Sequence, residues 1–159
     1  MKIPVGAIIV SCFAVIWTAA GARSLGRHLF AFLLSISILI SLGVIYAGAH
    51  IETGQRLTFN SKAYNISVAL EAVLIFFAVL FLRQPDRKHR LLPIISIIVG
   101  LHFFGMVWAL DRNLYWWVGG AMCLLPVLAM SILPPNIWAP VVGLGCAVIL
   151  WLSAIGGFF

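Results

Sequence analysis

The sequence predicts an all-α fold, a polytopic bundle of transmembrane helices. Of its 159 residues, 64% are hydrophobic and 9% are charged, whereas soluble domains carry about a quarter charged residues. No charged residue follows Arg112, and the earlier charges gather in short clusters between long apolar runs. A charge at the centre of a bilayer is costly, so these clusters mark the membrane boundaries. We expect one integral membrane domain over residues 1–159.

Six apolar runs are long enough to cross the bilayer as helices, given about 30 Å of hydrocarbon and a rise of about 1.5 Å per residue. Five spans are the alternative, with one run lying on the membrane or re-entering it, because the third run is short. Only Pro134, Pro135 and Asn136 divide the last two runs, and this turn signal cannot continue a helix. The predicted spans are Ile3–Ala20, Leu29–Ala49, Ile66–Leu82, Leu91–Leu110, Tyr115–Leu133 and Ile137–Phe158.

The first run resembles a secretory signal peptide, because Lys2 precedes it and Ala20-Gly21-Ala22 has the small residues of a cleavage site. However, Arg23 and Arg27 follow immediately. Positive charge at the C-terminal end of this run favours a cytoplasmic position for that end, so the N-terminus lies outside. The small-residue site would then be out of reach of the signal peptidase. We therefore expect the first span to be retained.

The linker between the third and fourth runs is the most basic part of the chain, with Arg83, Arg87, Lys88 and Arg90. By the positive-inside rule this linker faces the cytoplasm. Six spans then put both termini on the extracytoplasmic side, and the lysines and arginines divide six inside to four outside. We expect the host to be a bacterial cytoplasmic membrane.

The net charge of +6 would suggest a nucleic-acid partner in a soluble protein. Here the basic residues flank apolar spans, so we expect the four of the 83–90 linker to contact anionic lipid headgroups and expect no nucleic acid. The bilayer is the first partner. A second copy of the chain or another membrane protein is the further partner that we consider.

A short internal likeness suggests a repeat. Ile3–Ser11 aligns without gaps on Leu92–Gly100, matching a proline and an Ile-Ile-Val triplet. The match opens the first and fourth spans, so two halves of three spans would have opposite orientations, as in inverted-repeat transporters. The alternative is a chance likeness between apolar segments, because the similarity fades after Gly100.

Glu71 and His102 are the outstanding polar residues inside the apolar runs. Glu71 lies eleven residues before Leu82, and His102 lies eleven residues after Leu91. Two antiparallel helices joined by the short 83–90 linker would bring both side chains to the same depth. A carboxyl group beside an imidazole is tolerable in hydrocarbon, and such a pair can exchange protons near neutral pH. The alternative is an interhelical hydrogen bond that only holds two helices together.

Other polar residues on the predicted outer side could line a funnel open to the exterior, although each could equally be an ordinary solvated helix end. They are Tyr46, His50, Glu52, Asp111 and Arg112. A haem would need two histidines at similar depth, and His50 lies about 15 Å further out than His102. The three cysteines show no metal-binding spacing. We expect reduced thiols and neither a metal nor another cofactor.

We interpret the chain as a small transporter or channel-like permease with an intramembrane proton-exchanging pair, Glu71 and His102. The alternative is a non-catalytic membrane partner or assembly subunit in which the pair only fixes helix packing. The third hypothesis is a membrane-embedded enzyme acting on a lipid or quinone-like substrate. It is the weakest, because the sequence shows no Ser/His/Asp, Cys/His or metal-binding motif.

Overall fold

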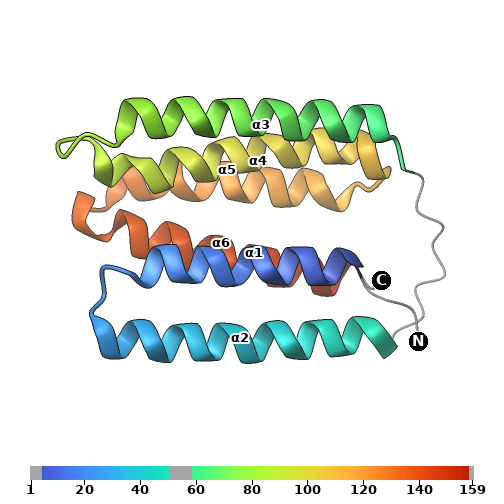
Figure 1. Ribbon diagram of the computed structural model, residues 1–159, viewed down its shortest axis with the longest axis horizontal. Coiled ribbons are helices and arrows are strands. Elements are labelled where there is room, and N and C mark those ends of the chain that lie inside the picture. The colour runs from blue at the N-terminus through green and yellow to red at the C-terminus, as the bar shows by residue number, and fades with distance from the viewer. Residues whose placement is uncertain (1–4, 51–58, 158–159) are drawn as a thin grey trace. The chain divides into compact units, whose positions relative to one another are not determined.

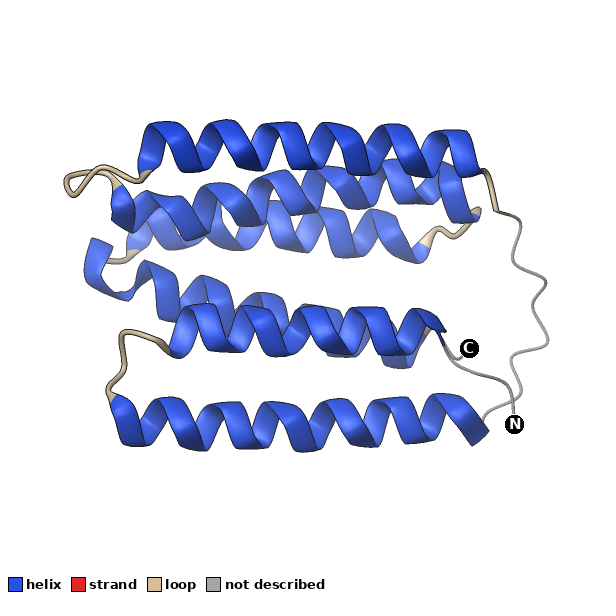
Figure 2. Ribbon diagram, in the orientation of Figure 1, coloured by secondary structure: helices blue, strands red, loops and turns tan. Residues whose placement is uncertain are grey.

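The computed structural model describes residues 5–50 and 59–157, which form six α-helices and one short 3-10 helix. Figure 2 shows helices joined by short loops, with no strand among the residues described. The predicted all-α helix bundle is therefore confirmed. The helices are α1 (Val5–Ala22), α2 (Arg27–His50), α3 (Ser61–Leu82), η1 (Lys88–Arg90), α4 (Leu91–Leu110), α5 (Leu114–Ile132) and α6 (Pro135–Gly156).

Five of these helices, α2 to α6, are long and apolar enough to cross a membrane. α1 has 18 residues, about 27 Å of rise against about 30 Å of hydrocarbon. Large apolar side chains are exposed along the helices, for example Leu39 on α2 and Phe81 on α3. Water would disfavour so much exposed apolar surface, whereas lipid does not. The chain is thus a membrane protein, and the choice between five and six spans depends on α1.

The observed helix ends differ from the predicted spans where polar residues belong to a helix. α4 has the predicted bounds, but α3 begins five residues earlier, at Ser61. Asn60 explains this start, because its side chain accepts a hydrogen bond from the Ala63 N–H at 3.2 Å and caps the helix. α6 begins at Pro135, since proline needs no N–H donor in a first turn.

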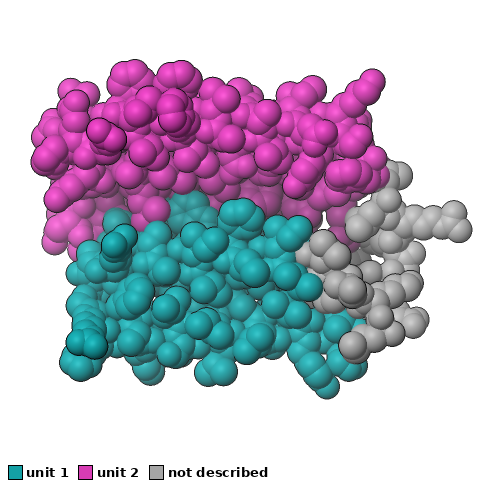
Figure 3. Space-filling view, viewed as in Figure 1, with its two compact units in different colours: residues 1–55, 139–159 teal, residues 56–138 magenta. Residues whose placement is uncertain are grey.

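The helices fall into two compact units, which Figure 3 draws in different colours. Unit 1 comprises residues 1–55 and 139–159, with α1, α2 and most of α6, and unit 2 comprises residues 56–138, with α3, α4 and α5. The halves of the predicted inverted repeat would instead be α1–α3 and α4–α6. The aligned helices, α1 and α4, lie in different units, and the repeat stays a prediction.

Small and polar residues hold unit 1 together, where α1 and α2 run side by side (Figure 1). The Trp151 Nε1–H of α6 donates to Ser41 Oγ of α2 at 3.1 Å, and the Ser41 hydroxyl donates to the Ser11 carbonyl of α1 at 3.3 Å. α1 and α6 also approach closely at two glycines: a Cβ added to Gly21 would lie 2.8 Å from Gly143 Cα. Such close contact is how helices associate in lipid.

In unit 2, α4 packs against both α3 and α5 (Figure 1). α4 and α5 meet at Gly100 and Gly119, where a Cβ on Gly119 would lie 2.8 Å from the Gly100 carbonyl oxygen. Beside this contact, Cys123 Sγ lies 3.6 Å from the Ile97 carbonyl. The two backbones therefore approach too closely for larger side chains, which sets α4 firmly on α5.

Pro126 interrupts the hydrogen-bond ladder of α5, and α4 compensates for it. Proline has no N–H, so the carbonyl four residues earlier, that of Met122, loses its helical donor. The Ser96 hydroxyl of α4 donates to that carbonyl at 2.9 Å. Ser96 and Met122 are fully buried, so no water could replace this bond.

This compensation predicts a coupled stability effect. Ser96→Ala should lower the free energy of unfolding by about 1 kcal/mol, because it leaves the Met122 carbonyl without this donor. In a Pro126→Ala background the helix supplies its own donor, so the same Ser96→Ala change should cost less. The measurement is unfolding in mixed micelles by SDS titration.

Ser131→Ala is the matched control, because the exposed Ser131 hydroxyl only donates to a carbonyl of its own helix. It should leave the stability nearly unchanged. Equal costs of Ser96→Ala in both backgrounds would contradict the account.

Candidate functional site

α3 contacts α4 along one narrow stripe. α3 has no buried residue, and its half-buried side chains recur every three or four positions, as one face of a helix does. Glu71 lies in the middle of this stripe, so its side chain is directed to the interface with α4. The stripe includes Ala63, Ser67, Glu71, Ile75, Ala78 and Leu82.

Glu71 and His102 meet across this interface. Glu71 Oε2 lies 3.3 Å from His102 Nδ1, and the two side chains are 20% and 12% exposed, respectively. The structure thus brings together the two residues that lie eleven positions from the helix ends Leu82 and Leu91, on either side of the 83–90 linker. Their role as a functional site stays a prediction.

Ser67 is the third member of the group, and the sequence analysis missed it. Its hydroxyl lies 3.1 Å from His102 Nδ1 and also 3.1 Å from the His102 carbonyl oxygen. The signal was present in the sequence, because Ser67 lies four residues before Glu71 and therefore on the same helix face. We call Ser67, Glu71 and His102 the polar cluster.

A proton on His102 Nδ1 satisfies all three contacts of the polar cluster at once. The His102 carbonyl can only accept, so the Ser67 hydroxyl donates its single proton there. The Ser67 oxygen and the Glu71 carboxylate can then both accept from Nδ1–H. Without that proton, Ser67 would face two acceptors with one hydrogen, and Glu71 itself would need to be protonated. We therefore assign a proton to Nδ1, and Nε2 is the ring nitrogen that these three contacts do not use.

The polar cluster contains the residue types of a Ser-His-acid hydrolase triad but not its geometry. In such a triad the serine contacts one ring nitrogen and the acid contacts the other, so that the imidazole can pass a proton between substrate and serine. Here Ser67 and Glu71 both contact Nδ1. The histidine therefore has no free base directed at the Ser67 hydroxyl, and the arrangement does not activate a nucleophile.

Neighbouring helices fill the space beside the two glycines near His102. A Cβ on Gly105 would collide with the Ser67 side chain, and a Cβ on Gly100 would lie 2.6 Å from Cys123 Sγ. Gly105 thus lets α3 come close enough for Ser67 to reach His102. The space that these glycines leave is occupied by protein.

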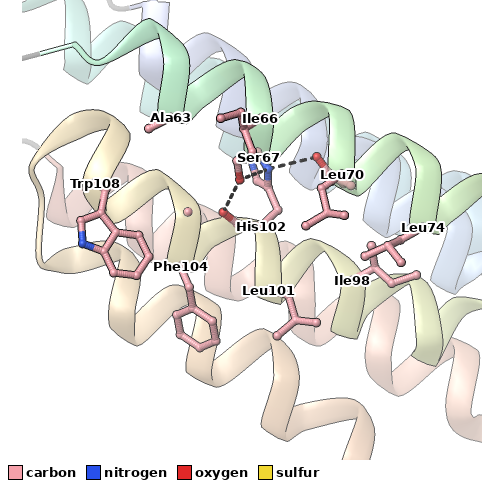
Figure 4. Close-up of a pocket in the computed structure, with 12 residues that line it drawn as sticks. Ala63, Ile66, Ser67, Leu70, Leu74, Ile98, Leu101, His102, Phe104 and Trp108 are labelled. Atoms are coloured by element: carbon pink, nitrogen blue, oxygen red, sulfur yellow. Dashed lines mark hydrogen bonds and ion pairs between the residues drawn. The ribbon is translucent and has the colours of Figure 1, made fainter.

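A groove of about 400 Å³ runs along α3 and α4, and the polar cluster lies in its middle (Figure 4). Its volume falls within the range of about 300–1,000 Å³ typical of small-molecule sites. Ile66 and Trp108 on its rim are 69% and 64% exposed, so the groove is open. Apart from the polar cluster, its lining comprises Ala63, Ile66, Leu70, Leu74, Ile98, Leu101, Phe104, Gly105 and Trp108.

The predicted outer funnel is not assembled in either unit. Tyr46 and His50 end α2 in unit 1, where His50 Nδ1 lies 2.9 Å from the Tyr46 carbonyl. Asp111 and Arg112 belong to unit 2, and Asp111 ends α4 with a positive φ of 51°, a conformation that aspartate tolerates better than most residues. Glu52 lies outside the described residues. The funnel stays a prediction.

The 83–90 linker is solvated, as a headgroup contact requires. Arg83, Arg87, Lys88 and Arg90 are all exposed, and the Arg87 Nε lies 3.5 Å from the Asp86 carboxylate. Such an exposed pair contributes little stability. The residues that the structure describes contain free cysteines and no group of three potential metal ligands.

In comparisons with known proteins, no protein-family model, curated protein or solved structure matches this chain. The case for a function therefore depends on the geometry of the polar cluster and its groove.

The Glu71 contact predicts different outcomes for two substitutions. Glu71→Gln should keep the stability near that of the wild type, because the amide oxygen can still accept from Nδ1–H. Glu71→Leu should lower the free energy of unfolding by about 1 kcal/mol or more, because it removes a partner of His102. SDS titration measures both.

Asp86→Leu serves as the control, because it removes a carboxylate from the exposed linker and should change the stability little. A Glu71→Leu protein as stable as the wild type would show that the contact contributes nothing to packing.

Proposed function

We propose that this membrane protein is a small transporter or channel-like permease in which Glu71 and His102 exchange protons. The contact between the Glu71 carboxyl and His102 Nδ1, at 3.3 Å, carries the proposal. Proton relays in membranes use carboxyl and imidazole groups. Placing an ionisable side chain at this depth costs free energy, so its presence there favours a functional role.

Two further observations support proton exchange. Both side chains line the open groove, so a proton donor can reach them. With the proton of Nδ1 shared between Ser67 and Glu71, Nε2 is the ring nitrogen that can change its charge. The polar cluster can therefore load and release a proton without breaking the contacts that join α3 to α4.

One observation favours the alternative, a partner or assembly subunit in which the polar cluster only fixes packing. α3 has no buried residue, and Ser67 and Glu71 supply its polar contacts to α4 at the middle of the interface. A helix attached so lightly benefits from any interhelical hydrogen bond. Proton movement separates the two functions, because packing alone needs none.

The orientation belongs to the same proposal. The exposed basic linker between α3 and α4 supports a cytoplasmic position for that end of the helix pair, next to anionic headgroups. With six spans, both termini are then extracytoplasmic.

Proteoliposomes containing the purified chain and a trapped pH-sensitive dye test the proposal. A potassium diffusion potential set with valinomycin should drive proton uptake several-fold above that of empty liposomes. Glu71→Gln should reduce the uptake to the level of empty liposomes, because a neutral amide cannot offset the positive charge that His102 gains with the proton. Asp86→Asn, which removes an exposed carboxylate of the linker, should leave the uptake unchanged.

Uptake equal to that of empty liposomes would contradict the permease. If Glu71→Leu also destabilised the same protein, that result would favour the packing role.

A further inference from the structure

The groove along α3 and α4 has the dimensions of a lipid-like ligand. Its lining runs from Ala63 to Leu74 on α3, a rise of about 16 Å, roughly half of the 30 Å hydrocarbon thickness. Both walls come from neighbouring helices of one unit, and exposed apolar side chains form the rim. A molecule dissolved in the bilayer could therefore enter sideways without crossing an aqueous phase.

The two ends of the groove differ in chemistry. The end near Ala63 has the aromatic side chains of Phe104 and Trp108, which lie one helical turn apart on α4 (Figure 4). The other end, near Leu74 and Ile98, is aliphatic. Aromatic walls favour a ring through stacking contacts, whereas aliphatic walls suit a hydrocarbon chain.

Apart from the indole N–H of Trp108 at the aromatic end, the side-chain hydrogen-bonding atoms that line the groove belong to the polar cluster near its middle. Among the described residues no hydrogen bond to His102 Nε2 is present, while Nδ1 is fully used. Glu71 Oε1 is the second atom of the cluster that a ligand could contact. A ligand between the two ends thus meets one nitrogen and one oxygen that can donate or accept according to their protonation.

Depth restricts the charge of the ligand. Glu71 lies eleven residues from the end of α3 at Leu82, about 16 Å from the linker, which places the cluster inside the hydrocarbon. A second charge beside Glu71 and His102 would be costly there. The group that meets the cluster should therefore be neutral when it arrives.

We propose that the groove binds an uncharged lipophilic phenol. The ring lies against Phe104 and Trp108, the hydroxyl group hydrogen-bonds to His102 or Glu71, and the hydrocarbon chain lies along Leu74 and Ile98. This inference rests on the proposed function in that the ligand uses the same proton-exchanging pair.

Trp108 provides the readout, because it lines the groove and bromine quenches tryptophan fluorescence at short range. The probe is an alkylphenol that carries its bromine on the ring, added to the full chain in bilayer nanodiscs. Its methyl ether is the matched control, since it has the same shape but no hydroxyl proton. The phenol should quench saturably and bind about tenfold more tightly than the ether. Trp108→Phe should reduce the saturable quenching, and the remainder should come from Trp116, whose ring centroid lies 5.7 Å from that of Trp108.

A pair of alanine substitutions on α3 tests the location. Ala63→Phe fills the aromatic end and should abolish saturable quenching, whereas Ala69→Phe, on the exposed face outside the groove, should not. The phenol and ether comparison on the wild type does not depend on either variant folding. Equal binding of phenol and ether, or quenching that Trp108→Phe leaves unchanged, would overturn the proposal.

A brominated aliphatic alcohol separates the ring from the hydroxyl group. Binding as tight as that of the phenol would overturn the assignment of a ring. The proton-uptake assay keeps the two proposals apart. Proton uptake that depends on Glu71, without phenol binding, would support the permease and contradict the proposed ligand. Phenol binding without proton uptake would support the ligand and contradict the permease.

Discussion

One ring nitrogen, His102 Nδ1, is the constraint on which the arrangement of α3 and α4 depends. α3 packs through a single half-buried stripe, and in lipid no hydrophobic force drives two apolar helices together. The contacts of Ser67 and Glu71 with Nδ1 therefore favour one rotation and one register of α3. At the start of α3, the Asn60 N–H also donates to the Ala109 carbonyl of α4 at 2.9 Å. The open groove follows from this light attachment.

The cluster needs a firm support, and α5 provides it. Close contact between Gly100 and Gly119 brings α4 and α5 together, and the Ser96 hydroxyl takes the place of the donor that Pro126 removes. α4 thus presents His102 from a closely packed pair of helices, while α3 has no buried residue on the opposite side. Such a combination of a fixed and a lightly held helix suits a site that opens to lipid.

The charge clusters were enough to predict six helices, because a charge in hydrocarbon is costly and charged residues therefore mark the helix ends. The bounds of α4 were predicted without error. α3 begins earlier than predicted, because its first turn is polar and its signal is the Asn60 cap rather than hydrophobicity. Counting residues from the linker placed Glu71 beside His102. Ser67 was missed because a serine in an apolar run has no distinctive pattern of its own. The sequence also does not show that Ser67 of α3 occupies the space beside Gly105.

Nitrogen-15 NMR of the His102 ring, with the chain in lipid bilayers, tests the central claim most directly. The account predicts that the neutral ring carries its proton on Nδ1, and that Glu71→Leu alters the Nδ1 signal more than the Nε2 signal. A neutral ring with its proton on Nε2 would contradict the account, because Ser67 and Glu71 could not then both accept from Nδ1.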